Sequence, residues 1–208
     1  ATVESARNAV EPLLTSWERH VSLTQGRNEI AFEYDDADVV DRDPPEPGET
    51  GECAVEESLT LAASVGVSIS EHITRGKYPD PPRDFETSPE VEALLERYYR
   101  CLDGEERLIP MANFCYTVLK GIAGSKSAAK KQFNVSGGVL TTLGALTAQG
   151  DLTTARKWRG EEQNRPLTAA EENWLKEAVR LLILRLGKYN ACPDGSFEKI
   201  TMDDLPEL

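Results

Sequence analysis

The sequence predicts an α+β protein that is predominantly α, with an N-terminal helix and a small β-sheet packed on a C-terminal helical bundle. Apolar residues recur at helical spacing before residue 26 and through the second half, but alternate with small polar residues over residues 58–70. A proline-rich stretch, residues 76–90, separates the two patterns. A chain of 208 residues is long enough to bury a core. We therefore expect an acidic helix-plus-strand region over residues 1–85 and a helical bundle over residues 86–208.

The first expected element is a helix that ends near Gly26. Its apolar face consists of Val10, Leu13, Leu14, Trp17 and Val21. Pro12 is compatible with this helix if it lies in the first turn, where a missing N–H costs no helical hydrogen bond. After this helix the period changes to two, because Ile30, Phe32 and Tyr34 alternate with polar residues, which indicates a strand.

Two proline-rich segments flank the strongest strand signal. Residues 44–52 hold three prolines and two glycines with no apolar anchor, so we expect them to be flexible and readily cut by proteases. From Leu59 to Ile69 every second residue is apolar, which fits one long strand or a bent pair. The four prolines of residues 76–90 do not fit a helix interior or a central strand, and they mark the boundary between the halves.

Helices are expected throughout the second half. Ser88 is a good N-cap with Pro89 at the first helical position, and Pro110 either begins the regular part of the next helix or kinks it. These helices are expected over about residues 88–103, 105–122, 126–132, 137–148 and 168–187.

The last of these helices has the clearest signals at both ends. Thr168 and Glu171 form a capping box, and Gly187 is expected to end the helix. The residues expected to face inward in the three longer helices are Val91, Leu94, Leu95, Tyr98, Cys101, Leu102, Leu108, Met111, Ala112, Cys115, Val118, Leu119, Ile122, Trp174, Leu175, Ala178, Val179, Leu182 and Leu186.

The net charge of −13 is concentrated in the first half of the chain. Residues 1–100 carry 22 acidic and 9 basic side chains, whereas residues 101–208 carry 14 of each. Residues 120–165 hold eight basic and three acidic side chains and are therefore locally basic. The overall acidity argues against a general polyanion binder, but it does not exclude a local basic face.

The four cysteines, Cys53, Cys101, Cys115 and Cys192, lie far apart and form no CxxC pair, so neither a zinc site nor a disulfide framework is predicted. We expect them to be reduced, with Cys101 and Cys115 buried and Cys53 the most reactive. The longest strongly apolar run, Leu181 to Leu184, is far shorter than the roughly 20 residues of a membrane-spanning helix. No signal-peptide pattern is present at the start. We expect a cytoplasmic protein that binds no membrane.

No catalytic, cofactor or metal site is predicted. Residues 121–127 end in Lys-Ser like a phosphate-binding loop, but the glycine spacing is wrong and the segment follows a helix. The acidic residues 35–43 do not match a calcium-binding loop and fit a solvated loop. His20 and His72 have no nucleophile or carboxylate at a recognisable spacing. The sequence therefore leans towards a protein that is not an enzyme and holds no cofactor.

Residues 126–147 resemble the helix-turn-helix of transcription regulators. Ala129 would let two helices cross closely, Asn134 would form the tight turn, and Ser136 would cap the second helix. The exposed positions of that helix are two glycines and two threonines, which read base edges poorly, so any binding should be weak and indifferent to sequence. The residues expected to contact phosphates are Lys126, Lys130, Lys131, Arg156, Lys157 and Arg159.

The C-terminal half also resembles the HEPN class of helical domains over residues 104–122, 155–160 and 166–186. This family supplies ribonucleases and nucleotide-binding modules of defence and toxin systems. Its active members carry an RxxxxH motif, and neither histidine here has an arginine five residues before it. The resemblance therefore implies a relative that does not cleave RNA.

These observations favour a non-enzymatic intracellular binding or regulatory protein whose ligand is unknown. The expected partner is a protein, including a second copy of the chain, with weak or no nucleic-acid binding. One alternative is a nucleic-acid-binding regulator that uses residues 126–147. Another is a catalytically degenerate HEPN-like protein of a defence or toxin system.

Overall fold

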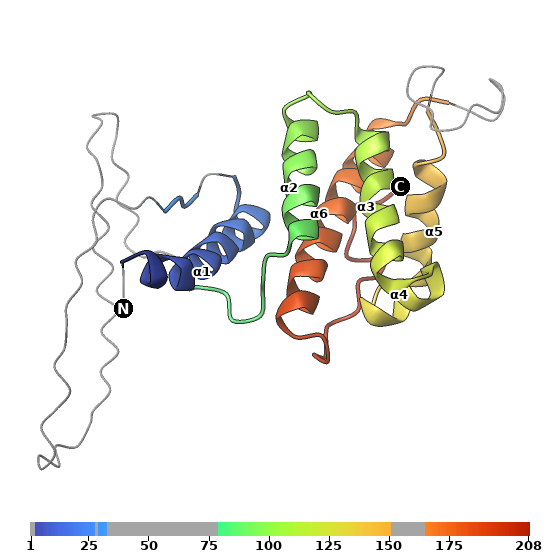
Figure 1. The fold of residues 1–208 in the computed structure, drawn as a ribbon. Coiled ribbons are helices and arrows are strands. Elements are labelled where there is room, and N and C mark those ends of the chain that lie inside the picture. The colour runs from blue at the N-terminus through green and yellow to red at the C-terminus, as the bar shows by residue number, and fades with distance from the viewer. Residues whose placement is uncertain (1–2, 28, 33–78, 151–164) are drawn as a thin grey trace, which may run out of the picture.

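The structure is a computed structural model that describes residues 3–27, 29–32, 79–150 and 165–208. Within these ranges the protein is predominantly helical, as the sequence predicts (Figure 1). The helices are α1 (Val3–Thr24), α2 (Pro89–Leu102), α3 (Leu108–Ala123), α4 (Lys126–Gln132), α5 (Gly137–Leu146) and α6 (Ala169–Ala191).

The small β-sheet of the predicted fold is not formed by the described residues. Its strongest candidate, residues 59–69, lies outside them, as does the segment 44–52. The strand predicted from Ile30 is absent where the chain after α1 is described. There the amide of Phe32 donates to the carboxylate of Glu18 (2.5 Å), and its ring centroid lies 4.9 Å from that of Trp17. Phe32 thus contacts α1 instead of a neighbouring strand, and Tyr34 lies outside the described residues.

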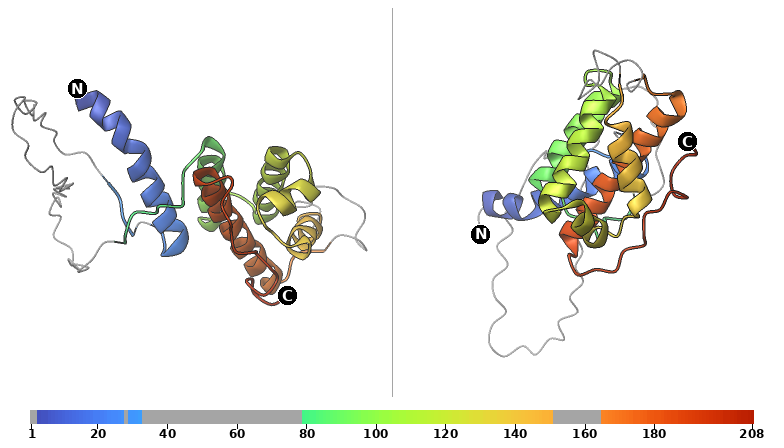
Figure 2. Two further views of the ribbon diagram at one scale, coloured as in Figure 1. Left: turned by 90° about the horizontal axis from the view of Figure 1, so that it is seen from below. Right: turned by 90° about the vertical axis from the view of Figure 1, so that its right-hand side faces the viewer.

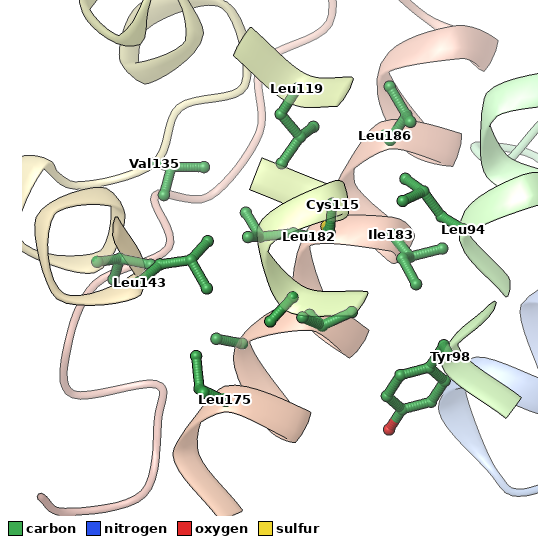
Figure 3. Packing of buried hydrophobic residues seen from close by; sticks show 14 of the residues in the cluster. Leu94, Tyr98, Cys115, Leu119, Val135, Leu143, Leu175, Leu182, Ile183 and Leu186 are labelled. Carbon is green, nitrogen blue, oxygen red and sulfur yellow. The ribbon is translucent and has the colours of Figure 1, made fainter. Parts of the chain in front are cut away.

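The core is centred on α6, which packs against α2, α3 and α5. Figure 3 shows side chains from α2, α3, α6 and the α4–α5 region converging on one cluster. Most of the residues expected to face inward are buried or partly buried there. Leu102 and Ile122 are exceptions, at 48% and 40% exposed, because both lie near the C-terminal ends of their helices, beyond the neighbouring packing.

The starts of α2 and α3 follow the local signals. The Ser88 side chain accepts a hydrogen bond from the amide of Val91 (3.3 Å), and Pro89 is the first residue of α2. Pro110 is the third residue of α3, where its lack of an N–H costs no helical hydrogen bond. Pro110 therefore belongs to the first turn of the helix.

The capping box at the start of α6 is confirmed. The amide of Glu171 donates to Thr168 Oγ1 (3.2 Å), and the amide of Thr168 donates to Glu171 Oε2 (2.8 Å). Arg165 adds two hydrogen bonds to the same carboxylate. These donors, Arg165 first, lower the pKa of Glu171 to about 2.

The prediction that Gly187 ends α6 is wrong, because the helix continues to Ala191. A Cβ at position 187 would lie 2.1 Å from the ring of Phe85, so the ring packs directly on the helix backbone. The amide of Glu86 also donates to the carbonyl of Gly187 (3.0 Å). Gly187 is thus a site of close approach between α6 and the segment before α2.

Pro12 lies well inside α1, so the helix accommodates it without the first-turn position that the sequence-based prediction set as a condition. The face predicted for this helix is also only partly buried, because Val10 and Leu13 are 39% and 50% exposed whereas Val21 is buried. Two views show that the C-terminal end of α1 meets the core and that its N-terminal end extends away (Figures 1 and 2). Exposure around Pro12 lets water hydrate the carbonyl that loses its helical partner.

The C-terminal part of α1 joins the same core as the later helices. Leu23 and Phe85, which precede the predicted boundary at residue 85/86, are buried in the cluster centred on α6. The Ser16 hydroxyl accepts a hydrogen bond from the amide of Thr87 (3.0 Å). The division into residues 1–85 and 86–208 stays a prediction.

Candidate functional site

The segment singled out for nucleic-acid binding folds as α4, a four-residue connection and α5. Ala129 is buried between α4 and the core, and Asn134 has a φ of 46°, in the left-handed region that permits a tight turn. The Ser136 side chain caps α5 by accepting from the amide of Val139 (3.3 Å). The local elements expected from the sequence are therefore present.

The predicted phosphate-binding residues are only partly described. Lys126, Lys130 and Lys131 are exposed on α4, whereas Arg156, Lys157 and Arg159 lie outside the described residues. Lys126 Nζ donates to the hydroxyl of Thr141 on α5 (2.9 Å). The stem of Lys130 lies over the first turn of α5, where a Cβ at Gly137 would be 3.8 Å from its Nζ. Lys126 and Lys130 therefore flank the start of α5.

The C-terminal tail, residues 193–208, lies along the connection between α4 and α5. Val135 and Ile200 form a parallel bridge in which the amide of Ser136 donates to the Ile200 carbonyl (2.8 Å). This pairing places Lys199, which the sequence did not single out, beside the α4–α5 connection. It also places Met202 3.3 Å from a Cβ at Gly138. Met202 thus lies beside the first turn of α5, while Gly138 itself stays exposed.

Arg185 of α6 joins the tail to the α4–α5 connection. Its guanidinium donates to the carbonyl oxygens of Phe133 (2.7 Å) and Glu198 (2.5 Å), and the side chain is buried. Asn134 adds a second contact between the same segments, since its Nδ2 donates to the Phe197 carbonyl (2.7 Å). Hydrogen bonds of this kind connect segments that no local sequence pattern relates.

A surface crevice lies where α1 passes the start of α2. This crevice has a volume of about 560 Å³. Its walls come from residues of two helices and the segment between them: Asn8, Glu11, Pro12, Thr15, Thr87, Ser88, Pro89 and Glu92. Glu92 is held there by Arg19, whose Nε lies 2.9 Å from its carboxylate. The crevice therefore combines proline rings and threonine methyl groups with two carboxylates.

His20 lies on α1 near the junction with α6. Its ring meets Phe85 edge-on at 5.4 Å between centroids. Burial lowers the pKa of His20 below its ordinary value; the nearby Asp84 carboxylate opposes this, and Lys188 adds to it. The side chain therefore packs as part of the helix junction. The other histidine, His72, lies outside the described residues.

The cysteines of the described residues are free. Cys101 and Cys115 are buried, which confirms that part of the prediction, and Cys192 is exposed at the end of α6. Burial raises the pKa of Cys115 to about 12, so its thiol stays protonated at neutral pH. Cys53 lies outside the described residues, and its reactivity stays a prediction.

Among the described residues, no group of three or more potential ligands is placed to hold a metal ion, and no helix is long and apolar enough to cross a membrane. Comparison with protein-family models, curated proteins and solved structures found no match. The structure thus defines a predominantly helical protein whose candidate sites are the α1–α2 crevice and the lysines around α5.

Proposed function

We propose that this chain is a non-enzymatic binding or regulatory protein that holds a basic segment of a partner protein in the α1–α2 crevice. The observation that carries the proposal is the crevice itself, about 560 Å³ in volume and bounded by Glu11 and Glu92. Pockets of roughly 300–1,000 Å³ accommodate ligands in proteins. The three cysteines of the described residues are free, which supports a reducing compartment, and we propose that the protein is cytoplasmic.

The charge around the crevice determines the kind of partner. Glu11 lies on one wall, and the first turn of α2 contributes Glu90 and Glu92. Arg19 offsets only part of this negative charge, through its ion pair with Glu92. A lysine or arginine side chain from a partner would therefore be attracted, while its apolar neighbours would contact Pro12 and Pro89.

Selection from a display library of random peptides tests this proposal. Wild-type protein should enrich peptides with at least one Lys or Arg beside apolar residues. Glu11→Lys should lose that preference, and Thr15→Trp, which fills the crevice, should lose binding. Glu207→Lys makes the same charge change on the exposed C-terminal tail and should leave the selected peptides unchanged. Equal enrichment by wild type and Thr15→Trp would place the binding site elsewhere.

The second candidate function is nucleic-acid binding at α4 and α5. The observation that favours it is the pair of capped helices joined by a tight turn at Asn134, with Lys126, Lys130 and Lys131 alongside. Gly138 and Thr141, which are exposed on α5, offer few groups that read base edges, and this supports weak binding without sequence preference. The HEPN resemblance and self-association stay predictions.

The salt dependence of duplex DNA binding separates the two candidates. A surface that neutralises about four to six phosphates gives a log-log slope of roughly −4 to −5. We expect no sequence-specific complex at roughly physiological salt, about 150 mM. Selection from random duplexes could return a defined sequence motif that the double variant Lys130→Glu, Lys131→Glu no longer selects. That result would make nucleic-acid binding the better supported of the two functions.

A further inference from the structure

A second cavity lies between α6 and the C-terminal tail, away from the α1–α2 crevice. Its volume is about 230 Å³. Leu181 and Leu184 of α6 and Ile200 of the tail form apolar walls. The charged residues of the lining are two basic ones, Arg185 and Lys188, and two acidic ones, Asp84 and Glu198. This volume is below the roughly 300–1,000 Å³ of pockets for drug-sized ligands, so the cavity suits a small molecule.

Arg185 is the unusual feature of this cavity, because it is 8% exposed and yet has no carboxylate among its hydrogen-bond acceptors. Its terminal nitrogens donate to the carbonyl oxygens of Phe133, Asn134 and Glu198. Carbonyl groups satisfy N–H donors, but they do not neutralise a buried positive charge. The Asp204 carboxylate acts on Arg185 only over a distance and accepts hydrogen bonds from Thr201.

The Glu198 carboxylate also acts on Arg185 without a hydrogen bond, since that residue contacts the guanidinium through its carbonyl oxygen. Lys188 is already paired, because its Nζ lies 3.0 Å from Asp84 Oδ2. Because these carboxylates offset the positive charge of Lys188 and Arg185, the cavity is not a general binding site for anions. Nη1 of Arg185 donates to two carbonyl groups and Nη2 to one, so the described hydrogen bonds leave the Nε–H and one Nη2–H, a parallel pair of donors that suits a planar acceptor.

The apolar walls restrict the ligand further. The ring of Phe197 lies 5.2 Å from the guanidinium carbon of Arg185 and is part of the cavity lining. A flat or short-chain apolar body fits between this ring and the leucines, whereas a strongly hydrated ion would leave them in contact with water. Arg pairs with a carboxylate through two parallel hydrogen bonds, which a spherical ion does not match.

We propose that the cavity between α6 and the C-terminal tail binds a small carboxylic acid with an aromatic or short apolar body, its carboxylate on Arg185 and its body against Phe197 and Leu184. Such a ligand would contact α6 and the tail together. It would therefore bind only while the tail lies on α6.

Nuclear magnetic resonance titration of the full chain with sodium benzoate tests this site, with total ionic strength held constant by sodium chloride. Benzamide has nearly the same shape without the charge and is the comparison ligand. We expect saturable shifts at the amides of residues 184–188 and 196–200, with a Kd for benzoate at least tenfold below that for benzamide. Equal affinities, or no saturation below about 10 mM benzoate, would overturn the proposal.

Two variants distinguish the loss of the binding site from the loss of the folded structure. Leu184→Phe fills the cavity and leaves Arg185 and its carbonyl acceptors in place, so it should abolish the benzoate shifts while the circular dichroism spectrum stays unchanged. Leu102→Phe makes the same substitution at an exposed position of α2 and should bind benzoate like wild type. Unchanged benzoate affinity in Leu184→Phe would overturn the assignment.

A third comparison tests the ligand class. Arg185→Lys keeps a positive charge but loses the planar fork, so the benzoate Kd should rise at least fivefold in protein that is still folded. Inorganic phosphate should bind more weakly than benzoate to wild type. Tighter phosphate binding would replace the carboxylate assignment with a phosphate one and overturn the proposal as stated.

Discussion

Helices α1 and α6 have nearly the same length, 22 and 23 residues, but they are attached to the protein by different forces. Nine residues of α6 are buried, and eight of these carry apolar side chains or no side chain. In α1 the buried residues among those described are Ser16, Val21 and Leu23, all in its C-terminal half. Apolar packing therefore holds α6 along most of its length, whereas α1 is held near one end.

Polar contacts complete the attachment of α1. Ser22 is hydrogen-bonded to Tyr99, and Arg180 donates to the carbonyl of Leu23 (2.5 Å). Arg19 forms an ion pair with Glu92, although both side chains are more than one-third exposed. Exposed ion pairs contribute little to stability, so α1 should open at a lower free energy than α6. A loosely held helix beside a crevice is suited to adjust to a partner.

The largest expected difference between the two helices comes from truncating a leucine in each. Leu182→Ala on α6 removes a fully buried side chain and should lower the free energy of unfolding by about 2–5 kcal/mol. Leu13→Ala on α1 removes a side chain that is half exposed and should change it by less than about 0.5 kcal/mol. Urea denaturation measures both. Comparable losses would contradict the unequal attachment of the two helices.

Substitutions at two separate glycines test the close approach of Phe85 to α6. In Gly187→Ala the new Cβ would overlap the Phe85 ring, so we expect a loss of about 1–3 kcal/mol from forced repacking. Gly121→Ala, in α3, meets nothing within 4 Å and should stabilise the protein by about 0.5–1 kcal/mol. Thermal and urea denaturation should show opposite signs. A stabilising effect of Gly187→Ala would disprove the contact.

The capping box should contribute a smaller amount at the start of α6. Thr168→Ala should cost about 1 kcal/mol, because the amide of Glu171 loses its acceptor. The lowered pKa of Glu171 means that its ionised form stabilises the fold at neutral pH and that this contribution is lost as pH falls from 4.5 towards about 2. The difference in free energy of unfolding between wild type and Glu171→Gln should therefore become smaller as the pH falls over that range. A difference that grows on acidification would contradict the assignment.

The smallest effect should come from the ion pair that joins α1 to α2. Arg19→Ala should lower stability by only about 0.2–1 kcal/mol, because the pair with Glu92 is partly exposed to water. Amide hydrogen exchange should become faster in the C-terminal half of α1 and remain unchanged in α6. Arg100→Ala removes a more exposed pair, with Glu105, that does not involve α1, and should leave α1 unaffected. Faster exchange in both helices would show that α1 and α6 open together.

Local signals in the sequence determined where α2, α5 and α6 begin. Ser88 with Pro89, and Thr168 with Glu171, mark the starts of α2 and α6 because capping depends on residues three apart in the chain. The inward faces of α2, α3 and α6 were also predictable from the spacing of apolar residues, with Leu102 and Ile122 as exceptions. Helical spacing did not show that Val10 and Leu13 of α1 would be left exposed, because exposure depends on which neighbours are present.

The candidate sites were less predictable than the helices. Lys126, Lys130 and Lys131 were found because they are close together in the sequence. The α1–α2 crevice and the cavity beside Arg185 were not, because each is formed by residues from segments far apart in the chain.

The sequence by itself determined the positions of the helix caps, the apolar faces and the charge asymmetry, because each depends on neighbouring residues or on composition. Only the tertiary structure decided that Gly187 lies inside a helix, since the Phe85 ring approaches it from about a hundred residues away. It also decided that Arg185 is buried against carbonyl groups of two separate segments. Long-range packing selects such contacts, and no periodicity along the chain encodes them.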